Sequence, residues 1–341
     1  MKTIVTCLFC LIGFCTSAQK VVAIKSELIF NNPPFAFCHA ATVVELPNHQ
    51  LMVSCFDGPF ESSPQTSIWL TSYQNKQWTN PTEITNGIIN DSIRYACWNP
   101  VLVKTKHQKL FLFYKVGLSP REWFGMMKSS TDEGKSWSSS VKLPGNFLGP
   151  IKNKPVELAD GSLLHPSSTE SKDLKHWNIH LEKSDNNANH WQYINIDCDT
   201  FNVIQPTLLK YGKDSLQLLC RSKQNYIVQS WSFDDGNTWQ PLTKTKLQNP
   251  NSGIDAVSLS NKMQLLIYNP LPAGKDWVNG RNRLVAAISN NGINWKDVYT
   301  LEDLPDGEFS YPAVIQTSDK LIHIVYTYNR KNIKHVVLKI E

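Results

Sequence analysis

The chain has 341 residues, 41% of them hydrophobic, and a formal net charge of +5. Its lysines and arginines are spread along the chain without a basic tract, which argues against a nucleic-acid partner and leaves an anionic small substrate open. After the N-terminal segment no stretch is apolar and long enough to cross a bilayer, which argues against a membrane-spanning protein.

The first 18 residues have the layout of a cleavable secretory signal. Lys2 precedes an apolar run over residues 4–14, and small residues occupy positions 16–18. We therefore expect the mature chain, residues 19–341, to form a single domain of a soluble protein that is secreted or periplasmic.

Residues 21–30 alternate polar and apolar residues like a β-strand. Six units that resemble one another follow this segment. Each unit begins with a short run, often containing proline, that leads into alternating apolar residues. The runs contain His39, Trp98, Lys154, Gln205, Asp255 and Tyr311. Turn-rich connections separate the units, and no segment strongly predicts a helix.

A second repeat has the form Ser-x-Asp-x-Gly-x-Thr-Trp, and its clearest copies are residues 232–239 and 130–137. Looser copies precede Trp78, Trp191 and Trp295, so these tryptophans recur every 48 to 59 residues. This is the period of a repeat architecture. The Asp and Gly predict a tight turn under which the tryptophan packs, so the motif marks the fold rather than a substrate site.

This motif resembles the Asp-box of the sialidase superfamily. The resemblance implies an all-β fold, a six-bladed β-propeller with four antiparallel strands in each blade, and the six units account for the six blades. Residues 21–30 are then expected to complete the last blade and close the ring, because closure removes exposed sheet edges.

Five cysteines remain after the signal, an odd number that cannot pair fully within one chain. We expect free buried thiols, with a disulfide between Cys38 and Cys97 as the alternative. The cysteine spacing fits no zinc site, no Ca²⁺-loop pattern is present, and no cofactor site is expected.

The inner strands of a propeller begin together at one mouth of its tunnel, where loops carry function. The candidate site residues are therefore those at or near the six starts, together with arginines on neighbouring strands. They are His39, Trp98, Asn99, Lys154, Glu170, Gln205, Arg221, Arg281 and Tyr311.

Sialidases carry three arginines for a carboxylate, an Asp acid/base and a Tyr nucleophile paired with a Glu. The resemblance implies that Arg221 and Arg281 are the second and third arginines and that Tyr311 is the tyrosine. It fails elsewhere, because His39 stands in place of the first arginine and Gln205 in place of the Glu. The loop that holds the Asp, here residues 55–66, has no Asp at the aligned place.

Two arginines with a lysine still suit a carboxylate clamp, so we expect an acidic oligosaccharide as the partner. His39 and Tyr311 suit general acid/base catalysis without a carboxylate, which β-elimination on a uronate requires. This resembles the His/Tyr chemistry of propeller-fold polysaccharide lyases. We therefore expect a lyase or dehydratase acting at the non-reducing end of uronate-containing oligosaccharides.

Two alternatives stay open: an exo-sialidase-like hydrolase whose acid is Glu61 or Glu170, and a non-catalytic propeller that binds acidic glycans. The candidates also have structural interpretations. His39 and Tyr311 can be packing residues, Arg221 can pair with a carboxylate, and Trp98 can belong to the core.

Overall fold

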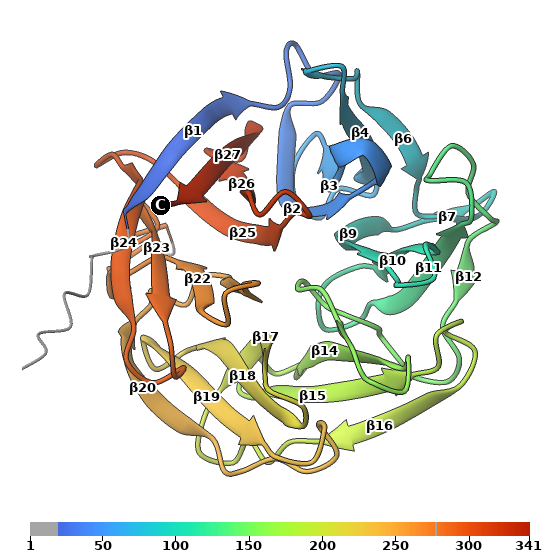
Figure 1. Cartoon of the computed structure of the whole chain (residues 1–341). Helices are drawn as coiled ribbons and strands as arrows, with labels where there is room; N and C mark the ends of the chain where they lie inside the picture. The colour runs from blue at the N-terminus through green and yellow to red at the C-terminus, as the bar shows by residue number, and fades with distance from the viewer. Residues whose placement is uncertain (1–19, 277) are drawn as a thin grey trace, which may run out of the picture.

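The structure is a computed structural model, and it describes residues 20–276 and 278–341. Six antiparallel sheets are arranged in a ring around a central axis, as Figure 1 shows. The prediction of an all-β, six-bladed propeller with four-stranded blades is therefore confirmed. The predicted secretory signal lies outside the described residues.

The first three blades follow one another along the chain. Blade 1 contains β2 (Phe37–Glu45), β3 (Leu51–Gly58), β4 (Ser67–Gln74), β5 (Gln77–Trp78) and β6 (Thr82–Thr85). Blade 2 contains β9 (Ala96–Lys104), β10 (Leu110–Gly117), β11 (Phe124–Ser130) and β12 (Val141–Lys142), and a small hairpin of β7 (Ile88–Asn90) and β8 (Ile93–Arg94) precedes it. Blade 3 contains β13 (Val156–Glu157), β14 (Leu163–Glu170), β15 (Trp177–Ser184) and β16 (Trp191–Asn195).

The other three blades complete the circle. Blade 4 contains β17 (Val203–Tyr211), β18 (Ser215–Ser222), β19 (Tyr226–Ser232) and β20 (Thr243–Gln248). Blade 5 contains β21 (Asp255–Ser258), β22 (Gln264–Tyr268), β23 (Arg283–Ser289) and β24 (Lys296–Asp303). Blade 6 contains β25 (Phe309–Gln316), β26 (Ile322–Tyr328), β27 (Asn332–Ile340) and β1 (Val21–Leu28).

The ring is closed by its first strand. β1 pairs antiparallel with β27, with Val21 opposite Ile340 and Leu28 opposite Lys334. The expectation that residues 21–30 complete the last blade is thus confirmed for Val21–Leu28. One sheet therefore joins the two ends of the described chain, and blade 6 depends on both.

Each clear Asp-box forms the predicted turn. In residues 130–137 the Asp132 carboxylate accepts hydrogen bonds from the Ser136 N–H (2.9 Å) and the Ser130 hydroxyl (2.7 Å). Gly134 has φ +82°, and Trp137 Nε1 donates to its carbonyl oxygen at 3.1 Å. Residues 232–239 repeat these contacts, so the motif is structural, as predicted.

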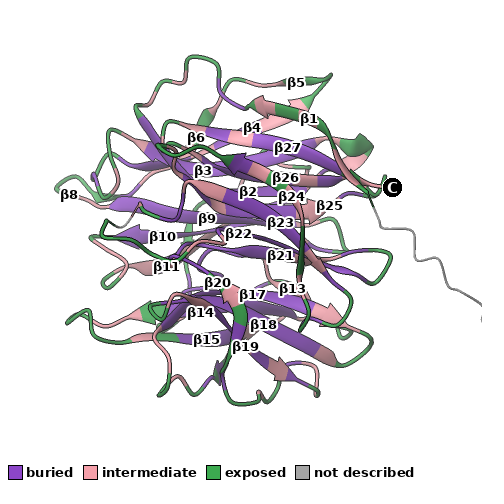
Figure 2. Ribbon diagram, turned by 90° about the vertical axis from the view of Figure 1, so that its left-hand side faces the viewer, coloured by how far each residue is buried: buried purple, intermediate pink, exposed green. Residues whose placement is uncertain are grey.

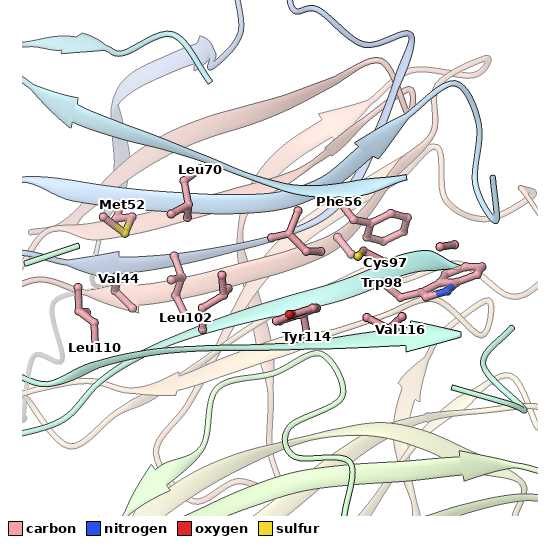
Figure 3. Packing of buried hydrophobic residues seen from close by; sticks show 14 of the residues in the cluster. Val44, Met52, Phe56, Leu70, Cys97, Trp98, Leu102, Leu110, Tyr114 and Val116 are labelled. Carbon is pink, nitrogen blue, oxygen red and sulfur yellow. The ribbon is translucent and has the colours of Figure 1, made fainter. Parts of the chain in front are cut away.

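The core lies between neighbouring blades. Figure 3 shows the seam between blades 1 and 2, where Met52, Phe56 and Leu70 face Leu102 and Tyr114. Buried residues follow the strands and exposed residues gather at the turns, as Figure 2 shows.

The sequence expectations on helices and on free thiols also hold for the described part of the chain, although Cys198 is only half-buried. Its only helix is a 3₁₀ turn, η1 (Pro47–His49), so none of its helices is long and apolar enough to span a membrane. The described cysteines, Cys38, Cys55, Cys97, Cys198 and Cys220, are all free, so the alternative of a disulfide between Cys38 and Cys97 is wrong.

Candidate active site

Four inner strands bulge at the mouth where they begin. In β2, β9, β17 and β25 the register with the next strand shifts, and one residue at each bulge has a positive φ. These residues are Ala40 (52°), Asn99 (40°), Gln205 (55°) and Tyr311 (53°). The last three precede prolines, where extended backbone is normal. Bulges re-aim side chains, and left-handed backbone at non-glycine residues gathers at functional sites, so this distortion marks the mouth as the candidate site.

A cavity of about 130 Å³ opens beside these bulges. It brings together six of the residues predicted from the sequence: Trp98, Asn99, Glu170, Gln205, Arg221 and Tyr311. Glu61, Trp123 and Trp177 complete much of its wall. The lining comes from blades 1, 2, 3, 4 and 6, so only the closed ring can assemble it.

The Tyr311 hydroxyl receives two hydrogen bonds in this cavity. Arg221 Nη1 donates to Oη at 2.9 Å, and Gln205 Nε2 donates at 3.4 Å. Arg221 Nη1 also donates to Gln205 Oε1 at 3.2 Å, so the three side chains form one network. Donors aimed at an oxygen stabilise negative charge that develops on it during a reaction. Oη is therefore suited to gain negative charge.

Arg221 is held firmly on its other side by Asn251. Its Nε donates to Asn251 Oδ1 at 2.8 Å, and its Nη2 donates to the Asn251 carbonyl oxygen. With the bonds to Tyr311 and Gln205, these contacts use all three nitrogens of the guanidinium group and four of its five N–H donors. Arg221 thus fixes the tyrosine, and its remaining donor capacity is small.

Two further arginines stand at the same mouth. Arg281 lies 3.4 Å from Glu308 and also donates to the Asn251 carbonyl oxygen at 3.3 Å. Arg330, in the turn between β26 and β27, pairs with Glu308 at 2.8 Å and with Glu61 at 2.5 Å. The positive potential is thus partly balanced by two carboxylates.

His39 lies beside the cavity rather than in its wall. It is 1% exposed, its ring centroid is 4.2 Å from that of Tyr311, and its Nδ1 is 2.8 Å from the Thr327 hydroxyl. Its Nε2 has no hydrogen-bond partner among the described residues. Burial, reinforced by nearby cations of which Arg330 is the strongest, lowers the pKa of His39 well below its usual range. The imidazole is therefore neutral and a weak base.

Glu170 ends β14 and forms part of the cavity wall. Burial raises the pKa of its carboxyl, and the nearby cations Arg221, Arg121 and Lys223 only partly oppose this effect. A carboxyl group with a raised pKa holds a proton more readily at neutral pH, which is the property of a general acid.

Lys154 is not brought to this cavity. Its ammonium pairs with Asp255 at 2.8 Å, and its side chain lines a separate depression with Val43 and Gln316, near the other ends of the inner strands. Lys152 lies closer, with its ammonium 5.9 Å from the Tyr311 ring centroid. Burial lowers the pKa of Lys152 to about 7.

Sequence reasoning did not single out Asn251, Trp177, Glu308 or Arg330. Trp177 begins β15 and Arg330 lies in the turn between β26 and β27, whereas Asn251 and Glu308 lie in the connections that precede β21 and β25. None of the four belongs to the short runs that mark the starts of the inner strands. Counting strands within each unit would have placed Arg330 and Trp177 at the correct mouth. Among the described residues no group of three or more His, Cys, Asp or Glu side chains could hold a metal ion.

The model of the BNR repeat-like domain family matches residues 49–324. The chain belongs to this family. Comparison of the BNR repeat-like protein with curated protein sequences finds no match.

Solved structures share the fold of this BNR repeat-like protein at low sequence identity. A Dyadobacter fermentans protein of unknown function has a TM-score of 0.76 at 17% identity, over 94% of this chain and 99% of that one. The NanB sialidase of Streptococcus pneumoniae has a TM-score of 0.69 at 13% identity, over 92% and 70%. The Trypanosoma rangeli sialidase has a TM-score of 0.68 at 15% identity, over 95% and 59%. The likeness to these solved structures is one of fold.

Proposed function

We propose that this protein is a glycoside hydrolase that removes an acidic sugar from the non-reducing end of an oligosaccharide. The observation that carries the proposal is the Tyr311 hydroxyl, which receives bonds from Arg221 and Gln205 in a cavity that also contains Glu170. The sialidases among the proteins of similar fold support the same class of substrate by analogy.

Each group has a distinct role in this proposal. The positive potential of Arg221, Arg281 and Arg330 attracts the sugar carboxylate to the mouth. Glu170 donates its proton to the leaving oxygen as the glycosidic bond breaks. Tyr311 Oη, as a phenolate that has lost its proton to water and is stabilised by the two donors, bonds to the anomeric carbon. A second water, deprotonated by Glu170, then displaces Oη from the anomeric carbon and releases the sugar. The secretory signal predicted at residues 1–18 supports a location outside the cytoplasm for this activity.

The proposal is tested by hydrolysis of fluorogenic sialosides and glycuronides by the wild-type protein and two variants. Tyr311→Phe should lower kcat/KM by about a hundredfold or more, because it removes the reacting oxygen. Glu170→Gln should slow disaccharides much more than fluorogenic glycosides, because a good leaving group needs little protonation. Tyr193→Phe, on an exposed outer-strand tyrosine, is the control. Near-normal turnover by Tyr311→Phe would overturn the proposal.

β-Elimination on a uronate is the second candidate, and Gln205 is the observation that favours it. The Gln205 amide cannot take a proton from the Tyr311 hydroxyl, as a carboxylate would. The ring centroids of His39 and Tyr311 are 4.2 Å apart, so the two groups that this reaction needs lie side by side. Elimination creates a conjugated double bond, so ultraviolet absorbance during incubation with uronate oligosaccharides separates the two reactions. Binding without either product would leave a glycan-binding propeller.

A further inference from the structure

A second cavity, of about 300 Å³, adjoins the first. The two cavities share three wall residues: Pro120, Trp123 and Glu170. The proposed proton donor therefore stands at the boundary between them. In a disaccharide that occupied both, the glycosidic oxygen would lie at this boundary, beside Glu170.

The walls of the second cavity suit a sugar ring. Trp123, Phe124 and Phe147 are all partly exposed and supply aromatic surface. Polar residues, among them Asn146 and Thr169, also line the cavity. Ligand sites typically combine apolar and aromatic walls with a few polar groups that fix orientation.

Two cations give this cavity a charge preference. Arg121 and Lys142 both line it, and both are exposed. The Lys142 ammonium lies 4.7 Å from the centroid of the Phe124 ring, which places it over an aromatic wall. Arginine and lysine side chains at such a wall favour a ligand that carries a carboxylate.

The loop that forms one wall is fixed by buried contacts. Glu182, which is fully buried, accepts hydrogen bonds from the Leu148 N–H (3.0 Å) and the Gly149 N–H (2.6 Å). The buried Lys115 ammonium donates to the Pro150 carbonyl oxygen at 2.7 Å. These bonds hold the loop of residues 145–150 in place before any ligand arrives, which lowers the entropic cost of binding.

We propose that the second cavity binds the leaving sugar of the substrate and that Arg121 and Lys142 select a leaving sugar with a carboxylate. The proposal rests on the glycoside hydrolase function proposed above. It defines the substrate class more narrowly, as an oligosaccharide in which two consecutive sugars are acidic.

The test compares pairs of disaccharides that share the same acidic sugar at the non-reducing end. One pair is disialic acid and sialylgalactose, with galactose as the neutral second sugar, and the other is digalacturonic acid and galacturonyl-rhamnose. Affinity is measured by calorimetry in the Tyr311→Phe background, so that the substrate is not consumed. The value of kcat/KM is measured with Tyr311 intact. We expect the doubly acidic member of a pair to bind more tightly, and Arg121→Ala and Lys142→Ala each to reduce this preference about two- to fivefold at low salt.

Lys109→Ala is the matched control. Its ammonium also lies 4.7 Å from a phenylalanine ring centroid, that of Phe111 in the same blade, but at the turn between β9 and β10, away from the cavity. This variant should keep the full preference. Equal affinity for both members of each pair, or a preference that survives the loss of Arg121 and Lys142, would overturn the inference.

The two proposals fail in different ways. If fluorogenic monosaccharide substrates are hydrolysed but the second sugar's charge has no effect, the second cavity is not selective and the hydrolase proposal stands. If no substrate is hydrolysed but the doubly acidic disaccharide still binds preferentially through Arg121 and Lys142, the binding site stands and the hydrolase proposal is wrong.

Discussion

Gln205 decides what Tyr311 can do. Its Oε1 accepts from Arg221 and its Nε2 donates to the Tyr311 hydroxyl, so both partners of the tyrosine are donors. Two donors stabilise charge on Oη but neither can accept its proton. The site therefore has the means to stabilise an activated tyrosine without a neighbouring base to produce one.

Replacing this amide with a carboxylate should supply the base. In Gln205→Glu the new carboxylate keeps an acceptor for Arg221 and offers a second one to the Tyr311 hydroxyl. If Tyr311 attacks the anomeric carbon, we expect kcat on fluorogenic acidic glycosides to rise roughly tenfold or more, since a positioned base contributes at least this much. Gln205→Met, which removes both functions, should lower it. A fall in kcat for Gln205→Glu would show that Tyr311 does not need to lose its proton to a base.

Whether the sequence predicts a site residue depends on whether that residue lies at the start of an inner strand or in a connection. Tyr311, Gln205 and Asn99 stand at the repeated starts of inner strands, so their convergence follows from the fold. Asn251 stands in a connection whose path the repeats do not determine, and Arg330 stands in a turn whose place follows only from counting the strands within a blade. Lys154 fits the pattern, but it stands two residues after Lys152 and reaches a point further along the tunnel. Its ammonium pairs with Asp255, whereas the Lys152 ammonium donates to the Ile254 carbonyl oxygen.

At the level of the element, the Asp-box turns seal the seams between blades. Gly236 lies where an added Cβ would come within 2.7 Å of Leu164 in blade 3 and 3.1 Å of Leu216 in blade 4. Gly134 lies in the same way over Met52 in blade 1 and Leu110 in blade 2. The glycine thus allows both a positive φ and a close approach to the preceding blade, which explains why the motif recurs with the blades.

Two glycine substitutions separate these effects. Gly236 and Gly161 have nearly equal φ, +86° and +84°, but a Cβ at Gly161 would meet nothing within 4 Å. Gly161→Ala should therefore destabilise by about 1 kcal/mol through the backbone alone. Gly236→Ala should cost about 1–3 kcal/mol more, because Leu164 and Leu216 are fully buried and cannot move freely. Denaturant unfolding measures both, and equal losses would contradict the proposed sealing role.

At the level of the whole molecule, the six repeated units and the resemblance of their motif to the Asp-box predicted the ring, and residues 21–30 predicted its closure. This succeeded because a propeller is built from units whose signals lie close in sequence, and because an unpaired edge strand needs a partner. The side chains that secure the closure were not predicted. Glu27 on β1 accepts from Trp78 Nε1 at 2.8 Å and also contacts Lys25 (2.8 Å) and His335 (3.2 Å), so it joins blade 6 to blade 1.

This contact gives the closure a pH dependence. Burial alone would raise the pKa of Glu27, but hydrogen bonds from His335, Lys25 and Trp78 outweigh it and lower the pKa from 4.5 to about 2. A carboxyl group whose pKa is lower in the folded state than in the unfolded state stabilises the folded state. This stabilisation is complete at pH values above the unfolded pKa and is lost as the pH falls from about 4.5 toward about 2. Glu27→Gln should therefore lower Tm at pH 7 and show a smaller further loss of Tm between pH 5 and pH 3 than the wild type, as followed by thermal unfolding.

The control is Glu341→Gln, which breaks an exposed 3.3 Å pair with Lys339 at the end of β27 and should change Tm little. Identical acid profiles for the wild type and Glu27→Gln would mean that Glu27 does not link ring closure to pH.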